Sequence, residues 1–168
     1  MDEVRANVQF SDEFRTRSLL CFSETWLNET ITDTSIGVEG FILSRGDRTK
    51  ESGKKQGGRV RVFVIKKWSH PNNVTVKRKR CSPAVEILTV GIPPYYLPRE
   101  FSHVLMYVPP STDAKEATDT IASHVHDLDD RAPDAIKIIT GCLTTVTSER
   151  HSRTINNTSR VLRVKTEP

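Results

Sequence analysis

Two proline pairs divide the middle of the chain and limit what it can fold into. The apolar run 85–90 stops before Pro93, and the apolar run 104–108 stops before Pro109. Proline cannot donate to a strand ladder, so each run is predicted to be a strand that ends there. Apolar residues then recur at helical spacing over 114–128, which predicts an amphipathic helix. Strands followed by a helix predict an α/β protein with a sheet packed against a helix.

The same rules predict the other elements. We expect a helix over 2–17, strands over 19–22, 41–43, 60–64 and 135–139, and loops over 45–58 and 69–83. The last residues, 146–168, are rich in Ser, Thr, Asn and Arg and are predicted to be a disordered tail. A chain of 168 residues with 36% hydrophobic content fits one globular domain.

Positive charge is concentrated in one segment of the chain. Residues 45–80 hold 13 of the 25 Lys and Arg but 2 of the 21 Asp and Glu, so the remainder holds 12 basic and 19 acidic residues. Such a field attracts polyanions, and nucleic acid is the commonest of them. We therefore expect DNA contacts from Arg48, Lys54, Lys55 and Arg59. The alternative is a solvated loop with no partner.

Compartment and cysteine use are consistent with a protein from inside the cell. The first ten residues lack the apolar stretch of a secretory signal, and no apolar run is long enough to cross a membrane. The three cysteines form no CxxC pair, so no zinc site or disulfide framework is indicated. The basic run 77–80 is compatible with import into the nucleus.

Three residues follow or end predicted strands, where sites gather in α/β sheets. They are Glu24, Tyr107 and Cys142. A carboxylate such as Glu24 can hold Mg²⁺ through oxygen. A surface carboxylate with no ligand is the alternative that the local sequence leaves open.

Longer sequence blocks then occur in a characteristic order. They are "CFSETWL" at 21–27, "SGKKQGG" at 52–58, "YLPREF" at 96–101 and "YVPP" at 107–110. In this order they resemble the endonuclease domain of LINE-type non-LTR retrotransposons, over residues 1–145. That domain is a member of the endonuclease/exonuclease/phosphatase superfamily.

The resemblance implies a four-layer α/β/β/α sandwich that cleaves DNA with Mg²⁺. It implies that Glu24 is a metal ligand and that Tyr107 contacts the scissile phosphate. A metal clamp, hydrogen-bond donors and a base that activates water are what phosphodiester cleavage needs.

The chain departs from the family at several of these positions. Where the family has "GDFN", Cys142 stands at the Asp position and Thr144 at the Asn position. A thiol is mostly protonated at neutral pH and is a poor ligand for Mg²⁺. The stretch 101–107 is shorter than in the family, which predicts a damaged strand. The family's first strand and its catalytic His block lie outside the matched region, so we expect a partial sandwich of marginal stability.

Three functions follow as hypotheses. The first is a retrotransposon-derived endonuclease-like fragment that is catalytically inactive. The second is a non-catalytic nucleic-acid-binding module that uses the basic segment 45–80. The third is a weakly active Mg²⁺-dependent endonuclease that uses Glu24 and Tyr107.

Overall fold

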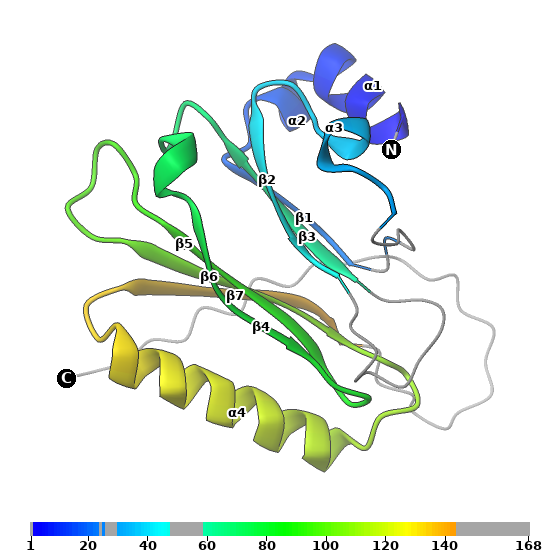
Figure 1. Ribbon diagram of the computed structural model, residues 1–168, viewed down its shortest axis with the longest axis vertical. Helices are drawn as coiled ribbons and strands as arrows, with labels where there is room; N and C mark the ends of the chain where they lie inside the picture. The colour runs from blue at the N-terminus through cyan, green and yellow to red at the C-terminus, as the bar shows by residue number, and fades with distance from the viewer. Residues whose placement is uncertain (1, 24, 26–29, 48–58, 144–168) are drawn as a thin grey trace.

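The computed structural model describes residues 2–23, 25, 30–47 and 59–143 (Figure 1). Its strands are Leu19–Phe22 (β1), Phe41–Gly46 (β2), Val60–Ile65 (β3), Thr75–Cys81 (β4), Glu86–Ile92 (β5), Phe101–Val108 (β6) and Ile136–Leu143 (β7). Its helices are Asp2–Phe10 (α1), Asp12–Arg15 (α2), Asp33–Ile36 (α3) and Ala114–Arg131 (α4), with a 3-10 turn over Pro71–Asn73 (η2). No described helix is both long and apolar enough to cross a membrane.

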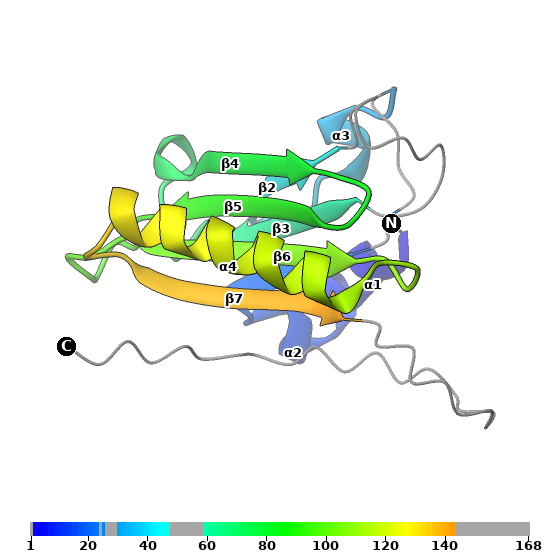
Figure 2. The same cartoon turned by 90° about the horizontal axis from the view of Figure 1, so that it is seen from below.

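The strands form two sheets. One is antiparallel with the order β1-β3-β2, and the other has the order β4-β5-β6-β7, with β6 and β7 parallel. Figure 1 shows the sheets stacked on one another, with α1 and α2 beyond the first sheet and α4 beyond the second. Figure 2 shows α4 lying along the outer face of the second sheet. The α/β class and the four-layer α/β/β/α arrangement predicted from the sequence are confirmed.

The core between the sheets follows from the alternation in β3. Its three valines, Val60, Val62 and Val64, are fully buried and pack in one cluster with Leu88 and Val90 of β5. Successive side chains of a strand point to opposite faces. The residues between the valines therefore lie on the outer face of the first sheet, toward α1.

A second apolar cluster fills the space between α1 and the first sheet. Val8 of α1 packs with Leu20, Phe41 and Phe63. The single helix predicted over 2–17 is wrong in one respect, because Ser11 has extended backbone angles and separates α1 from α2. The short α2 adds Phe14 to the edge of this cluster.

A third apolar cluster holds α4 against the second sheet. Ala117 and Leu128 of α4 are buried there, together with Ile87 and Met106. Asp113 caps the helix, since its carboxylate accepts a hydrogen bond from the Glu116 backbone N–H at 2.9 Å. The helix is the crossover that allows β6 and β7 to run parallel.

Two expectations about strands are corrected by the structure. The segment predicted as a loop over 69–83 contains the strand β4, which pairs with β5. Basic side chains are tolerated there because β4 is an edge strand that pairs on one side. The strand predicted to be damaged, β6, is eight residues long and pairs along its whole length with β7.

Candidate functional site

Several strands end at the same edge of the sandwich. The register of the second sheet places Glu86, Tyr107 and Cys142 side by side on β5, β6 and β7. In the first sheet, the end of β1 lies beside the beginning of β3, where Phe22 pairs with Arg61. We call this edge the strand-end site.

The structure brings together part of the site predicted from the sequence. Tyr107 and the backbone of Cys142 are neighbours in the sheet, and Arg59 lies directly before β3. The other predicted residues, Glu24, Arg48, Lys54, Lys55 and Thr144, lie outside the described residues. Their proposed roles remain predictions.

Tyr107 is held inside the sandwich. It is 5% exposed and belongs to the apolar cluster between the sheets, near the valines of β3. The backbone of β7 at Gly141, the residue before Cys142, lies very close to β6. A Cβ on Gly141 would lie 2.7 Å from the Met106 carbonyl oxygen. Close packing of β7 against β6 therefore depends on glycine at this position.

A buried carboxylate joins the two sheets at the strand-end site. Glu86 is 3% exposed and accepts a hydrogen bond from the Arg59 backbone N–H at 2.5 Å. The Arg59 carbonyl in turn accepts from the Thr25 N–H at 3.4 Å. The backbone of Arg59 thus connects β5 with the segment that follows β1.

The backbone of Arg59 has an unusual conformation at this connection. Arg59 has a φ of 75°, in the left-handed region that favours glycine. Non-glycine residues stay there when the surrounding structure holds them, often at functional positions. The sequence assigned Arg59 to DNA contact by its charge alone and missed Glu86. A glutamate at the start of the otherwise apolar run 86–92 was the available signal for Glu86.

The charges at this edge do not suit a magnesium ion. A cavity of about 100 Å³ is lined by Asp47, Glu86, Lys79 and Arg80, among others. The carboxylate of Asp47 is bound by Arg45 Nε at 2.5 Å, and that of Glu86 by the Arg59 N–H. Within the described ranges, no three His, Cys, Asp or Glu residues group as metal ligands. Mg²⁺ prefers several free oxygen ligands. In the described part of this cavity, Asp47 Oδ1 is buried without a hydrogen-bond partner. One such oxygen is fewer than the metal implied by the resemblance needs, and Glu24 lies outside the described residues.

A cysteine and a histidine meet inside the sandwich without forming a reactive pair. Cys21 Sγ lies 3.6 Å from His103 Nε2, which is also 3.0 Å from Thr140 Oγ1. Burial raises the pKa of Cys21 to about 11, against the opposing effect of a hydrogen bond with Thr140. Burial lowers the pKa of His103 to about 4. Both groups are uncharged at neutral pH, so the thiol is not an activated nucleophile.

A buried arginine lies on the outer face of the first sheet. Arg61 is 1% exposed and pairs in register with Arg45 of β2. Burial, and then repulsion from Arg45, lowers the pKa of Arg61 to about 10. Arg45 is itself bound by Asp47 and by Asp33, the latter at 2.9 Å. The guanidinium of Arg61 therefore stays charged at neutral pH inside the fold.

Comparison with known proteins identifies the fold. No family model and no curated protein sequence matches the chain. It is similar to the human Nocturnin catalytic domain with bound sulfate (TM-score 0.53, 9% identity, covering 84% of this chain and 56% of that one). It is similar to an endonuclease/exonuclease/phosphatase family protein from Bacteroides thetaiotaomicron (TM-score 0.54, 15% identity, covering 83% of this chain and 52% of that one). It is also similar to D. rerio TDP2 complexed with a single-strand DNA product (TM-score 0.52, 12% identity, covering 83% of this chain and 53% of that one).

The chain spans about half the length of these solved structures. At such low identity, the likeness shows the fold, and function has to be argued from the site. The chain has the fold of these structures, one of which is an endonuclease/exonuclease/phosphatase family protein, and it is the fold that the sequence blocks implied.

Proposed function

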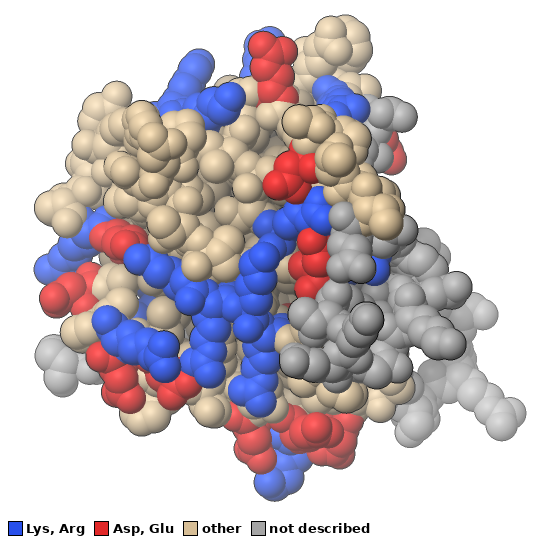
Figure 3. Space-filling model, viewed as in Figure 1, with Lys and Arg blue, Asp and Glu red and all other residues tan. Residues whose placement is uncertain are grey.

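We propose that this chain is a retrotransposon-derived, endonuclease-like module that binds DNA without cleaving it. The observation that carries the proposal is the run of four cationic residues on the edge strand β4, Lys77 to Arg80, which we call the β4 basic surface. Figure 3 shows Lys and Arg side chains gathered in a band across this face of the molecule. The retrotransposon origin rests on the sequence blocks described above.

The cationic side chains of β4 do not alternate regularly between the two faces of the sheet. The strand has a register shift between Val76 and Arg78, of the kind that a β-bulge produces. Lys77 reaches across Gly91 toward the α4 side, so closely that a Cβ on that glycine would clash with Lys77 Cε. Arg78 also faces α4, where it is bound to Asp127. The bulge therefore brings two successive cations to one face.

The other end of β4 reaches the strand-end site. Lys79 and Arg80 line the small cavity that also contains Glu86. A DNA backbone lying along β4 would meet the four cations from Lys77 to Arg80 and would end beside Glu86 of the strand-end site. Lys and Arg that neutralise phosphates release counterions, and this supplies most sequence-independent affinity.

The absence of cleavage is proposed from the chemistry of the same edge. The register position beside Tyr107 is a cysteine, whose thiol is a poor ligand for Mg²⁺. Asp47 is bound through Oδ2 by Arg45, and Glu86 through Oε2 by the Arg59 N–H. Among the described residues that line the small cavity, Asp47 Oδ1 is then the one buried carboxylate oxygen left without a hydrogen-bond partner.

Binding is tested by titrating a fluorescent DNA duplex at several salt concentrations. We expect Lys79→Gln/Arg80→Gln to weaken binding and to reduce the slope of log K against log salt by about 0.9 for each phosphate that the variant no longer neutralises. Lys115→Gln is the matched control, since Lys115 is an exposed cation on α4 that pairs with Asp119. Equal affinity and slope for both variants would contradict the proposal.

Cleavage is tested separately on supercoiled plasmid with Mg²⁺, with and without EDTA. We expect no nicking under either condition. Nicking that EDTA stops and that Glu24→Ala abolishes would instead establish the weakly active endonuclease. DNA binding could still hold in that case, so the two parts of the proposal fail independently.

A further inference from the structure

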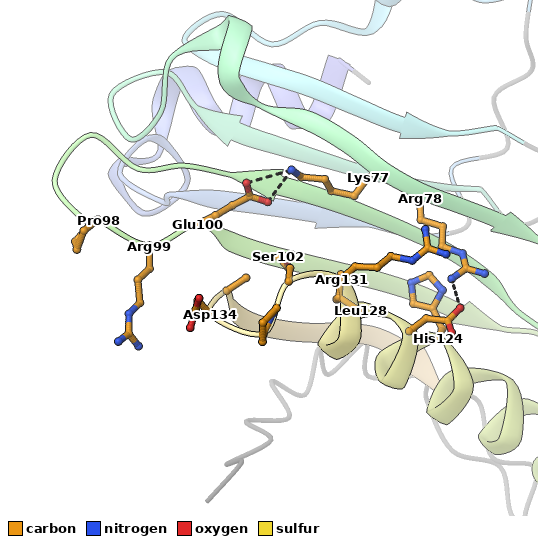
Figure 4. A pocket seen from close by; sticks show the side chains of 14 residues that line it. Lys77, Arg78, Pro98, Arg99, Glu100, Ser102, His124, Leu128, Arg131 and Asp134 are labelled. Atoms are coloured by element: carbon orange, nitrogen blue, oxygen red, sulfur yellow. Dashed lines mark hydrogen bonds and ion pairs between the residues drawn. The ribbon is translucent and has the colours of Figure 1, made fainter. Parts of the chain in front are cut away.

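A larger cavity lies at the opposite end of the second sheet. Its volume is about 620 Å³, and it opens between β4, the segment before β6 and the C-terminal end of α4 (Figure 4). Ser102 of β6 lines it, five residues from Tyr107 along the strand. At a rise of about 3.3 Å per residue, this places the cavity roughly 16 Å from the strand-end site.

Four cations from three elements line this cavity. Lys77 and Arg78 come from β4, Arg99 from the segment before β6, and Arg131 from the last turn of α4. Three acids, Glu100, Asp127 and Asp134, line it as well. Cations therefore exceed acids by one.

The ion pairs leave part of the positive charge unmatched. Lys77 is bound to Glu100 at 3.1 Å, and Arg78 is bound to Asp127. The hydrogen bond from Arg78 lowers the pKa of Asp127, and the charge of Arg131 acts on the same carboxylate. Two guanidinium groups thus share one carboxylate. Arg99 has no ion pair or hydrogen bond with any residue that the structure describes.

Two buried polar side chains also line this cavity. Ser102 is 1% exposed and His124 is 2% exposed. His124 Nε2 lies 2.7 Å from Thr89 Oγ1, but neither its Nδ1 nor Ser102 Oγ has a hydrogen-bond partner among the described residues. A buried polar atom left without a partner destabilises the fold, so such atoms usually have a protein group, a ligand or a water to bind.

The size and lining of the cavity indicate the class of ligand. Small-molecule pockets are typically about 300–1,000 Å³ and combine apolar walls with a few polar groups. Here Pro98, Leu128 and Pro133 supply apolar surface beside the cations. A cavity of about 620 Å³ is much larger than a phosphate ion needs. The surplus volume fits an organic group attached to the phosphate.

We propose that this cavity binds a phosphate-bearing small molecule of nucleotide size. Arg99 and Arg131 bind the phosphate, because a guanidinium presents paired N–H donors that match phosphate oxygens. Ser102 and His124 line the part of the cavity wall beside which the organic group is placed. The cavity shares Lys77 and Arg78 with the β4 basic surface, but Arg99 and Arg131, which bind the phosphate, lie outside that surface.

The proposal is tested by calorimetric titration of the purified chain with deoxyadenosine 5′-monophosphate. Deoxyadenosine and inorganic phosphate are the two comparison probes. We expect the nucleotide to bind at least tenfold more tightly than either probe, since each lacks one half of the recognised ligand. Equal binding of inorganic phosphate and nucleotide would show a simple anion site and overturn the nucleotide assignment. No binding of any probe would overturn the site.

Variants connect the binding to the cavity. Arg99 and Arg131 are exposed, so Arg99→Gln/Arg131→Gln should fold normally and bind the nucleotide at least tenfold more weakly, while DNA affinity changes little. Lys79→Gln/Arg80→Gln should show the reverse. An unchanged nucleotide affinity in the first variant would overturn the proposal even if DNA binding is confirmed.

Ser102→Ala supplies a second readout. Removing a hydroxyl without a partner should leave the urea unfolding midpoint unchanged or higher while it weakens nucleotide binding. A purely structural role for Ser102 predicts the opposite pattern, a lower midpoint with unchanged binding, and that result would contradict its place in the site.

Discussion

Both sheets bury their outer faces under helices, but α4 covers its sheet with 18 residues and α1 with 9. The α4 layer is part of the chain that connects β6 to β7, and it buries His124 in contact with Thr89. The α1 layer contacts its sheet through apolar side chains, where Val8 meets Leu20 and Phe63. The difference teaches that α4 is joined to strands of its sheet at both ends and makes a polar contact with the sheet, whereas α1 meets its sheet through a small apolar cluster and makes its polar contacts, from Arg5, with the Ser35 and Gly37 carbonyls beside the sheet.

The largest difference is expected from shortening one apolar side chain in each cover. Leu128→Ala should lower the free energy of unfolding by about 2–5 kcal/mol, because it leaves a cavity against Ile87 and Met106. Val8→Ala removes fewer atoms from a smaller cluster and should cost less. Urea unfolding followed by circular dichroism measures both. If Val8→Ala proves the more damaging change, the α1 layer is the stronger cover.

Acid should lower the free energy of unfolding through a residue of α4, His124, and not through a residue of α1. Burial, and then the charges of Arg78 and Arg80, lowers the pKa of His124 to about 4. The unfolded chain binds this proton near pH 6.5, so stability is present above that pH and is lost as the pH falls toward 4. His103 adds a similar loss from the interior of the sandwich, up to about 3 kcal/mol for each group.

The contribution of His124 can be isolated by substitution. Between pH 4 and 6.5, the stability of His124→Gln should depend less steeply on pH than that of the unsubstituted chain, by about 1.4 kcal/mol per pH unit. Urea unfolding at half-unit pH steps measures the slope. Identical slopes would mean that His124 keeps an ordinary pKa in the folded chain.

The smallest effect concerns how α4 begins. Asp113→Ala removes the carboxylate that caps the helix and should cost about 1 kcal/mol. Ser111→Ala, two residues earlier, serves as the control and should cost almost nothing. The two melting curves can be compared directly. Equal destabilisation of both variants would locate the cap elsewhere in this turn.

Most of the fold was predictable because alternation and proline positions reflect backbone chemistry. The strand predicted over 19–22 matches β1, and the predicted strands over 60–64 and 104–108 lie within β3 and β6. β4 was missed because its side chains are mostly charged, which lowers its strand propensity. That propensity is a local property and does not include the hydrogen bonds that β5 offers to a neighbouring strand. The break between α1 and α2 at Ser11 was also missed. The apolar residues over 2–17 are widely spaced among charged ones, and this pattern does not show where a single residue leaves the helical conformation.

The candidate site was predictable only in part. Tyr107 and Cys142 could be placed together because both end predicted strands of one sheet. The role of Arg59 could not be predicted, because its backbone N–H makes the contact with Glu86 and its side-chain charge is irrelevant to that bond. The large cavity draws residues from β4, from the segment before β6 and from α4, which no local pattern connects.

Among the described residues, the strands of the first sheet lie within residues 19–65 and those of the second within residues 75–143. On a ribosome, β1, β2 and β3 can therefore pair before the second sheet has been synthesised. Until then, Val60, Val62 and Val64 have no partner sheet and expose an apolar surface. We expect the nascent chain to need protection from aggregation during this interval, and to be released from it when β5 docks.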